Sequence, residues 1–294
     1  MTIGIVANIT KAKVYEVISA LVKALKENDF DYLLMDNISE NKDLITEKIN
    51  KSKFIGNDKL CKKSDMIISI GGDGTMLATA YQAQFHNKPV LGVNLGKLGF
   101  LAEVNINQMD IFIKEIKDGN YEIEERMIIT GECAKHKIEK LYAINDIVID
   151  KGGWPKMIQM EVFIDDKYVT TFSADGLIVA TPTGSTGYSI STGGPIVSPK
   201  AEVITLSPIS PHSLTMRPLV LPGNEKIDIR VGSFHKEVLV NCDGQRVFTF
   251  PPPLEIKIQK SDRPFKLVRT SLTSYFETLR SKLLWGIDIR NNSF

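Results

Sequence analysis

The 294 residues are enough for one large domain or two of ordinary size. Hydrophobic residues make up 43% and charged residues 24%, as in an average globular protein, and no apolar run is long enough to cross a membrane. Lys and Arg (36) balance Asp and Glu (35) without clustering, so we expect no nucleic-acid partner. The N-terminus shows no basic leader or cleavage site, and we therefore expect a cytoplasmic protein with no membrane partner.

The first hundred residues alternate between strand-like and helix-like patterns. Short apolar runs predict strands, and apolar residues at helical spacing predict helices between them. The predicted strands are 2–7, 30–35, 65–70 and 89–94, the predicted helices are 14–25 and 75–85, and residues 37–63 are expected to form short helices and a loop. This alternation is typical of a parallel sheet flanked by helices.

The pattern changes after residue 104. A helix at 109–116 is followed by many short strands separated by turn residues, which favours a sandwich-like all-β domain. The predicted strands are 122–133, 142–149, 159–164, 168–172, 177–181, 226–231, 237–241 and 254–259. We therefore expect an α/β domain over 1–104, completed by a C-terminal helix within 273–294, and a β-rich domain over 105–272.

The strongest chemical signal is Gly71-Gly72-Asp73-Gly74-Thr75, between a buried strand and a helix. Open α/β sheets bind ligands at this edge, where glycines allow close approach and helix amides favour phosphate. A carboxylate there would repel phosphate unless it accepts a proton or holds a magnesium ion. The structural alternative is a tight turn in which Asp73 only caps the helix.

Two common nucleotide motifs are absent. Residues 92–97 have three residues between the glycines and leucine after the lysine, so they are not a P-loop. The first strand is not followed by the glycine fingerprint of dinucleotide-binding dehydrogenases. The cysteines Cys61, Cys133 and Cys242 and the four histidines are scattered, so we expect reduced thiols and no metal site built from these side chains.

Two further segments carry polar groups that suit a sugar and a base. Residues 181–188 combine four hydroxyls, two glycines and Tyr188, although a plain Ser/Thr-rich loop would have the same composition. Asn145 and Asp146 fall inside a predicted strand, where neighbours point to opposite faces. A bulge or a strand end would explain that pair equally well.

Together, in this order, the three segments resemble the NAD kinase family. Residues 95–101 (LGKLGFL), 208–212 (PISPH) and 241–245 (NCDGQ) are similar to further family segments, and the resemblance covers nearly the whole chain. It implies transfer of the γ-phosphoryl group of ATP, or of another donor, to the 2′-hydroxyl of the adenosine ribose of NAD, giving NADP. It also implies a divalent ion such as Mg²⁺ and a homodimer or homotetramer.

The same resemblance assigns site residues by matching motif. Asp73 would be the general base, and Gly71, Gly72, Gly74 and Thr75 would bind phosphate. The NAD pocket would comprise Asp73, Gly74, Phe100, Asn145, Asp146, Lys156, Asp175, Thr183, Thr186, Gly187, Tyr188, Ser189, Ile190, Ser191 and Gln245.

Two residues depart from the family pattern. Gly187 replaces the usual alanine, and Ser173 stands where many members that also phosphorylate NADH carry arginine, which favours oxidised NAD.

Two other functions are alternatives to an NAD kinase. A diacylglycerol-type lipid kinase would share the GGDG turn but need an apolar acceptor pocket. A non-catalytic NAD-binding module would tolerate loss of Asp73.

Overall fold

The computed structural model describes residues 1–11, 13–96, 99–102, 104–133, 140–272 and 274–286. Lys97, Leu98 and His136, which the sequence analysis considered, lie outside these ranges. The described chain folds into two compact units, Met1–Glu125 with Lys266–Phe294, and Arg126–Phe265. These bounds differ from the expected division at 104 and 273, because strands before 126 and after 265 join the sheet of the first unit.

The first unit contains an eight-stranded sheet in the order β3-β2-β1-β4-β5-β20-β7, with β6 paired to β5. The neighbours from β3 to β5 pair in parallel, as the alternating pattern predicts. Its strands are β1 (Thr2–Ala7), β2 (Asp31–Met35), β3 (Phe54–Ile55), β4 (Met66–Ile70), β5 (Val90–Asn94), β6 (Val104–Asn105), β7 (Glu122–Arg126) and β20 (Phe265–Arg269).

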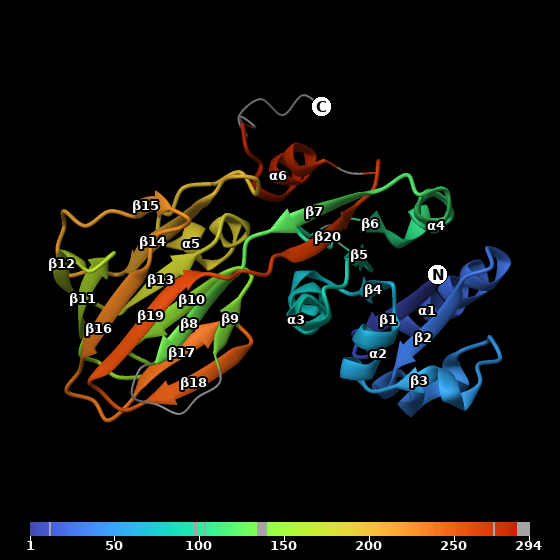
Figure 1. The fold of residues 1–294 in the computed structure, drawn as a ribbon, viewed down its shortest axis with the longest axis horizontal. Helices are drawn as coiled ribbons and strands as arrows, with labels where there is room; N and C mark the ends of the chain where they lie inside the picture. The colour runs from blue at the N-terminus through green and yellow to red at the C-terminus, as the bar shows by residue number, and fades with distance from the viewer. Residues whose placement is uncertain (12, 97–98, 103, 134–139, 273, 287–294) are drawn as a thin grey trace. The chain divides into compact units, whose positions relative to one another are not determined.

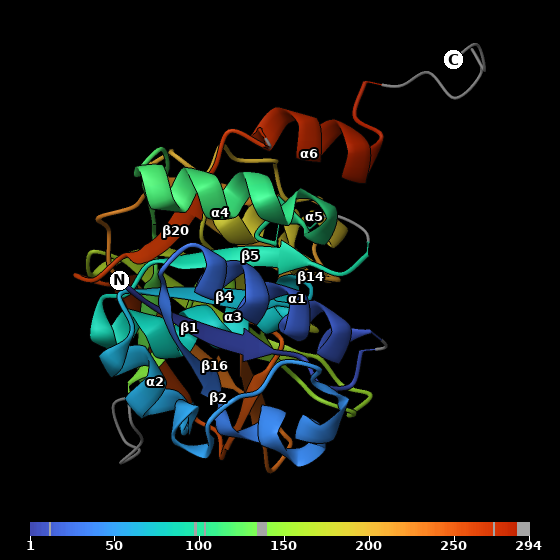
Figure 2. The ribbon, with the colours of Figure 1, turned by 90° about the vertical axis from the view of Figure 1, so that its right-hand side faces the viewer.

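Helices cover both faces of this sheet. The α-helices of the unit are α1 (Val14–Glu27), α2 (Asn57–Lys63), α3 (Asp73–Ala83), α4 (Met109–Asp118) and α6 (Tyr275–Leu283). Short 3₁₀ helices are η1 (Asp36–Leu44), η2 (Lys51–Lys53), η3 (Gln84–His86) and η4 (Ile106–Gln108). The apolar faces of α1 and α4 share one core with Ile3, Ile5 and Ile68 of the sheet, whereas α2 packs on β1 from the other face (Figures 1 and 2).

The second unit consists of two six-stranded antiparallel sheets, as expected for a sandwich-like domain (Figure 1). One has the order β15-β14-β13-β10-β17-β18, and the other the order β12-β11-β16-β19-β8-β9. The strands are β8 (Ile129–Cys133), β9 (Leu141–Ala143), β10 (Asp146–Asp150), β11 (Ile158–Ile164), β12 (Lys167–Ala174), β13 (Gly176–Ala180), β14 (Val203–Ile209), β15 (Leu219–Pro222), β16 (Ile227–Gly232), β17 (Val238–Cys242), β18 (Arg246–Phe250) and β19 (Leu254–Lys260), with η5 (Thr183–Thr186) and α5 (Tyr188–Ser191).

Alternate residues of both sheets form a single core in this unit. Ile147 and Ile149 of β10 point into it, as do Val238 and Val240 of β17. Because side chains alternate along a strand, Asp146, Val148 and Asp150 point to the opposite face of β10. Asp146, which was expected to bind ligand, therefore points to the outer face of the first of these sheets.

Two predicted strands are broken in the structure. Residues 122–133 form β7 and β8, which belong to sheets of different units, and residues 142–149 form β9 and β10, which belong to different sheets of the second unit. The structure also contains β14, β15, β18 and β20, which the sequence pattern did not predict; in β14, Ser207 and Pro208 interrupt the apolar run. Within the described ranges, no helix is long and apolar enough to span a membrane.

Candidate functional site

The GGDG turn of the first unit joins the end of β4 at Ile70 to the start of α3 at Asp73. Gly72 is the N-cap of α3, and Asp73 is the first helical residue. The side chain of Asp73 is directed at a loop and does not cap its own helix. The interpretation of Asp73 as only a helix cap is therefore wrong.

Three main-chain amides bind the Asp73 carboxylate. Oδ2 accepts a hydrogen bond from the amide of Phe100 at 2.9 Å, and Oδ1 accepts from Leu101 and Ala102 at 3.0 Å each. Gly99 precedes this loop, and a Cβ atom built there would lie 2.6 Å from Cγ of Asp73. A glycine at 99 is thus required for this cradle, which comprises the amides of residues 100–102.

The cradle leaves Asp73 with limited accepting capacity. An ionised carboxylate offers about four acceptor positions, of which three are occupied here. The remaining position is on Oδ2, which among the described residues accepts only from Phe100. The fixed carboxylate can therefore accept one more hydrogen bond, in a direction set by the loop.

In the second unit, the Asn145-Asp146 pair lies where the chain passes from β9 to β10. We call residues 144–146 the corner. The carboxylate of Asp243 accepts hydrogen bonds at Oδ1 from the amides of Ile144 (2.9 Å), Asn145 (2.7 Å) and Asp146 (3.4 Å). The pair therefore marks a strand end, which was one of the alternatives left open by the sequence.

The hydroxyl-rich segment binds the other side of the corner. The Thr181 amide donates to the Asn145 carbonyl at 2.8 Å, and the Thr181 hydroxyl donates to the Ile144 carbonyl at 2.6 Å. Gly184 packs so closely that an added Cβ atom would lie 2.5 Å from the carbonyl carbon of Asn145. Residues 181–188 are thus fixed against the corner by backbone contacts, which a plain Ser/Thr-rich loop would not require.

Asp146 is a buried carboxyl beside a second carboxyl. It is 4% exposed, and burial, together with the charge of Asp243, raises its pKa to about 7. Burial also raises the pKa of Asp243, although its three amides and Arg246 oppose that rise. Near neutral pH, Asp146 is consequently poised between an acid that donates and a carboxylate that accepts.

A pocket of about 350 Å³ opens at the corner, on the outer face of β10 and β17. Its lining includes Asn145, Asp146, Tyr188 and Asn241, with Val148 and Leu239 as apolar surface. The side-chain oxygens of Asn145 and Asn241 are buried without a hydrogen-bond partner among the described residues. A ligand with hydroxyl or amino donors would satisfy both oxygens.

The other sequence-predicted residues of this unit differ in burial and in distance from the pocket. Gly187 lies beside the side chains of Asn145 and Asp146, close to the pocket. Thr183 is buried and its hydroxyl accepts from Arg126, Ser189 is buried with its hydroxyl against Ser207, and Asp175 forms an ion pair with Lys151 at 2.6 Å. Thr186 and Ile190 are half-buried, and Lys156, Ser191 and Gln245 are exposed. Lys156 lies over the ring of Phe234.

Sequence reasoning missed three charged residues that contact the predicted ones, namely Arg126, Lys151 and Asp243. It also missed Arg246, which binds Asp243. Asp243-Gly244 is an Asp-Gly pair between two strands, which is a hairpin signal that could have been found. Its bonds to residues 144–146 join positions about a hundred apart in the chain, and no local pattern indicates them.

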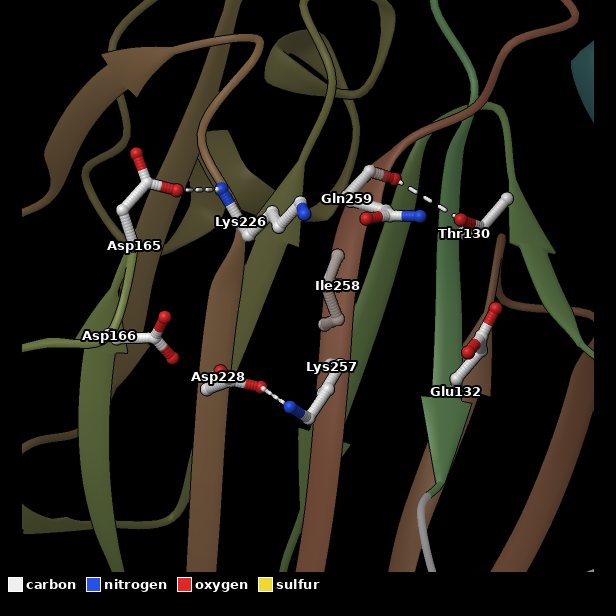
Figure 3. A pocket seen from close by; sticks show the side chains of 9 residues that line it. All are labelled: Thr130, Glu132, Asp165, Asp166, Lys226, Asp228, Lys257, Ile258 and Gln259. Carbon is white, nitrogen blue, oxygen red and sulfur yellow. Dashed lines mark hydrogen bonds and ion pairs between the residues drawn. The ribbon is translucent and has the colours of Figure 1, made fainter.

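A second pocket lies on the outer face of the other sheet and includes Asp165, Asp228 and Lys257 (Figure 3). Its charged groups include the ion pair of Lys257 with Asp228 at 3.7 Å. Among the described residues, no group of three or more His, Cys, Asp or Glu side chains is arranged to hold a metal ion. None of the predicted site residues belongs to this pocket.

The same chain matches known proteins along nearly its whole length. Residues 3–121 match the model of the ATP-NAD kinase N-terminal domain, and residues 144–270 that of the ATP-NAD kinase C-terminal domain. The NAD kinase of Natranaerobius thermophilus is 37% identical over 290 residues (98% of this chain, 99% of the relative). That of Geotalea daltonii is 39% identical over 244 residues (82% and 86%).

Solved structures agree with these matches. An Archaeoglobus fulgidus NAD kinase in complex with ATP has a TM-score of 0.75 and 27% identity, covering 97% of this chain and 99% of that one. The yeast NADH kinase complexed with NADH has the same fold, with a TM-score of 0.90, 24% identity and coverage of 100% and 90%. The matches do not support a lipid kinase or a non-catalytic module. The chain therefore belongs to the ATP-NAD kinase family of phosphotransferases.

Proposed function

We propose that this NAD kinase transfers the γ-phosphoryl group of ATP to the 2′-hydroxyl of the adenosine ribose of NAD, with Asp73 as the group that accepts the hydroxyl proton. The observation that carries this assignment is the Asp73 carboxylate in its cradle of three amides, at the carboxyl end of a parallel sheet. One acceptor position remains for the hydroxyl. The fixed direction of that position serves orientation, on which phosphoryl transfer depends.

The bonds and the proton of this phosphoryl transfer balance. The ribose oxygen attacks the γ-phosphorus, the bond between that phosphorus and the β,γ-bridging oxygen breaks, and ADP leaves. The proton of the hydroxyl passes to Asp73. A nearby carboxylate contributes on the order of 10²- to 10⁴-fold to such a step.

We propose that the dinucleotide binds at the corner of the second unit. The support is the combination of two unpartnered amide oxygens, the carboxyl of Asp146 and the half-exposed ring of Tyr188 around one pocket. Amide and carboxyl groups suit ribose hydroxyls, and the ring offers a face for a base. Thr183, Asp175 and Ser189 would act by shaping the pocket, because their side chains are bonded within the unit.

Magnesium, in this proposal, enters as part of the MgATP substrate. The described residues offer no cluster of three metal-ligating side chains, and most of the accepting capacity of Asp73 is used by amides. Magnesium commonly keeps several waters and binds through substrate phosphates, which fits this arrangement. The backbone at Gly71, Gly72, Gly74 and Thr75, at the start of α3, is where we place the phosphates.

Further features remain part of the proposal. Ser173 in β12 favours NAD over NADH, because it replaces the arginine found in many NADH-using members. We also propose that the chain forms a homo-oligomer, as the family resemblance implies, and that it acts in the cytoplasm.

The experiment is a coupled assay of NADP formation by the purified chain with magnesium. NAD and NADH are compared as acceptors, and ATP, other nucleoside triphosphates and polyphosphate as donors. We expect NADP from NAD and ATP, with NAD preferred over NADH. Binding of NAD by calorimetry without any NADP formation, or turnover of a diacylglycerol acceptor instead, would refute the assignment.

A further inference from the structure

We propose that Asp243, anchored by Arg246, is a positioning residue for the Asn145–Asp146 corner and thereby determines NAD affinity. This inference rests on the proposed function, in which the corner binds the dinucleotide. Neither residue was among the expected site residues. Asp243 belongs to the lining of the pocket, but its side chain is only 2% exposed and its oxygens are bonded to the corner amides and Arg246, so we place its action on the corner.

The backbone places Asp243 in a hairpin turn between β17 and β18. Asp243 and Gly244 have φ values of 57° and 69°, and the Gln245 amide donates to the Cys242 carbonyl at 3.1 Å. The Asp243 amide donates to the carbonyl of Asp146 at 3.0 Å. The main chain of the turn is thus bonded to the main chain of the corner, independently of the side chains.

The side chain of Asp243 then binds the main-chain amides of the corner. Residues 144 and 145 lie between the end of β9 and the start of β10 at Asp146, so their amides need acceptors outside a strand ladder. Oδ1 of Asp243 accepts from all three, and the side chain is only 2% exposed. Without this oxygen, the corner would have buried donors without partners, which favours a different backbone path.

Arg246 ties the other carboxylate oxygen to the preceding strand. Its Nη2 atom donates to Oδ2 of Asp243 at 2.8 Å and to the carbonyl of Tyr142 in β9 at 2.9 Å. The pair therefore joins the turn to both sides of the strand break. The result is a corner whose direction is set by two charged side chains.

In the proposed function, the corner is part of the surface that binds NAD. A change in the corner should therefore alter NAD affinity and not only the stability of the fold. The unpartnered oxygen of Asn145 and the carboxyl of Asp146 both line the pocket. The charge of Asp243 also acts on Asp146, since it helps to raise the pKa of that group to about 7. The titratable groups around Asp146 are Asp243 and Cys242 from the β17–β18 hairpin, with Asp150 from β10 and Tyr188 from α5 in the same pocket, whereas Arg246 lies against Asp243 and Cys242.

A pH shift would therefore follow from removing the charge of Asp243. Loss of the negative charge at 243 lowers the pKa of Asp146. NAD affinity that depends on the charge of Asp146 changes around pH 7 in the wild type. Whichever form of Asp146 binds NAD, the midpoint moves to lower pH in Asp243→Asn.

The test measures KM, kcat and calorimetric NAD binding from pH 5.5 to 9 in full-length variants. Asp243→Gly keeps the turn conformation but removes the acceptor, and we expect KM for NAD to rise about tenfold with kcat within about threefold. Asp243→Asn keeps an oxygen for the three amides but loses the acceptor of the Arg246 bond, so its KM should rise less than in Asp243→Gly, by about threefold. Its pH midpoint should fall by about one unit.

The matched control is Asp165→Asn, in the β11–β12 turn of the same unit (Figure 3). Asp165 also has positive φ, and its Oδ1 accepts the Lys226 amide at 3.0 Å, but it lies in the other pocket. We expect it to leave KM and the pH midpoint unchanged.

The outcomes separate the two proposals. Wild-type NADP formation tests the function, whereas the ratios of variant to wild type test the positioning role in turnover and in binding. A wild-type KM in Asp243→Gly, or coincident pH midpoints in Asp243→Asn and the wild type, would overturn the positioning role. If Asp243→Gly does not fold, Arg246→Gln decides, because it removes the guanidinium that binds Oδ2 of Asp243 and the Tyr142 carbonyl. A raised KM for NAD with little change in kcat would then support the role, and a wild-type KM would overturn it.

Discussion

Substitution of Gly99 by alanine tests the Asp73 cradle without changing Asp73 itself. The new methyl group would lie 2.6 Å from Cγ of Asp73 and overlap its carboxylate. The carboxylate end of a side chain can rotate away, whereas the backbone of the buried Gly99 cannot. We therefore expect Asp73 to leave the amides of Phe100, Leu101 and Ala102.

The magnitude follows from the three hydrogen bonds. Each bond to a charged acceptor contributes about 1.5–3 kcal/mol, so the cradle represents at most about 5–9 kcal/mol. Asp73 is half-buried and regains hydration when it turns out, so we expect a net loss of about 2 kcal/mol. For a chain of this size, that lowers the melting temperature by about 4–8 °C. Turnover should fall about 10²-fold or more, because the displaced carboxylate no longer meets the hydroxyl.

The assay is NADP formation at saturating NAD and ATP, together with a melting curve. Gly56→Ala is the matched control, because Gly56 is also a helix N-cap of the first unit with extended backbone, and a Cβ atom there would lie at an ordinary contact distance of 3.6 Å from Oδ2 of Asp36. We expect its turnover to remain close to that of the wild type. If Gly99→Ala keeps wild-type turnover and melting temperature, the cradle is not what positions Asp73.

Three other perturbations have defined outcomes. Asp73→Asn should bind NAD in calorimetry with wild-type affinity within about threefold yet lose about 10²- to 10⁴-fold in kcat, and near-normal turnover would rule out proton acceptance by Asp73. Gly184→Ala should lower the free energy of unfolding by about 1–3 kcal/mol and weaken NAD binding, since its methyl group meets the Asn145 backbone at 2.5 Å; an unchanged melting curve would contradict that contact. Because the pKa of Asp146 is raised to about 7, the folded state binds the proton more tightly, and wild-type stability should fall relative to Asp146→Asn as pH rises from about 4 to 7. A constant difference in melting temperature over that range would contradict the raised pKa.

Much of the first unit could be predicted because its signals are local. The alternation of apolar runs with helical spacing places β1, α1, β4 and α3, and the GGDG turn falls between the last two. The order of strands in the sheet and the return of β20 to it depend on long-range pairing, which no window of the sequence contains.

The corner shows where prediction from the sequence ends. Asn145 and Asp146 could be singled out as polar residues in an apolar run, but the strand break could not be distinguished from a bulge. At the strand break, the amides of residues 144–146 bind the carboxylate of Asp243. No pattern near residues 144–146 indicates this contact, and the sequence around Asp243 indicates only a hairpin turn. Likewise, the role of Gly99 is visible only when the Asp73 carboxylate is seen beside it.

The most direct measurement of the central claim is a crystal structure of the chain with NAD and a non-hydrolysable ATP analogue bound. The account predicts that an Asp73 oxygen lies about 2.6–3.2 Å from the 2′-hydroxyl of the adenosine ribose, with the amide cradle intact. An adenosine ribose bound away from Asp73, with that carboxylate still bonded only to residues 100–102, would contradict it.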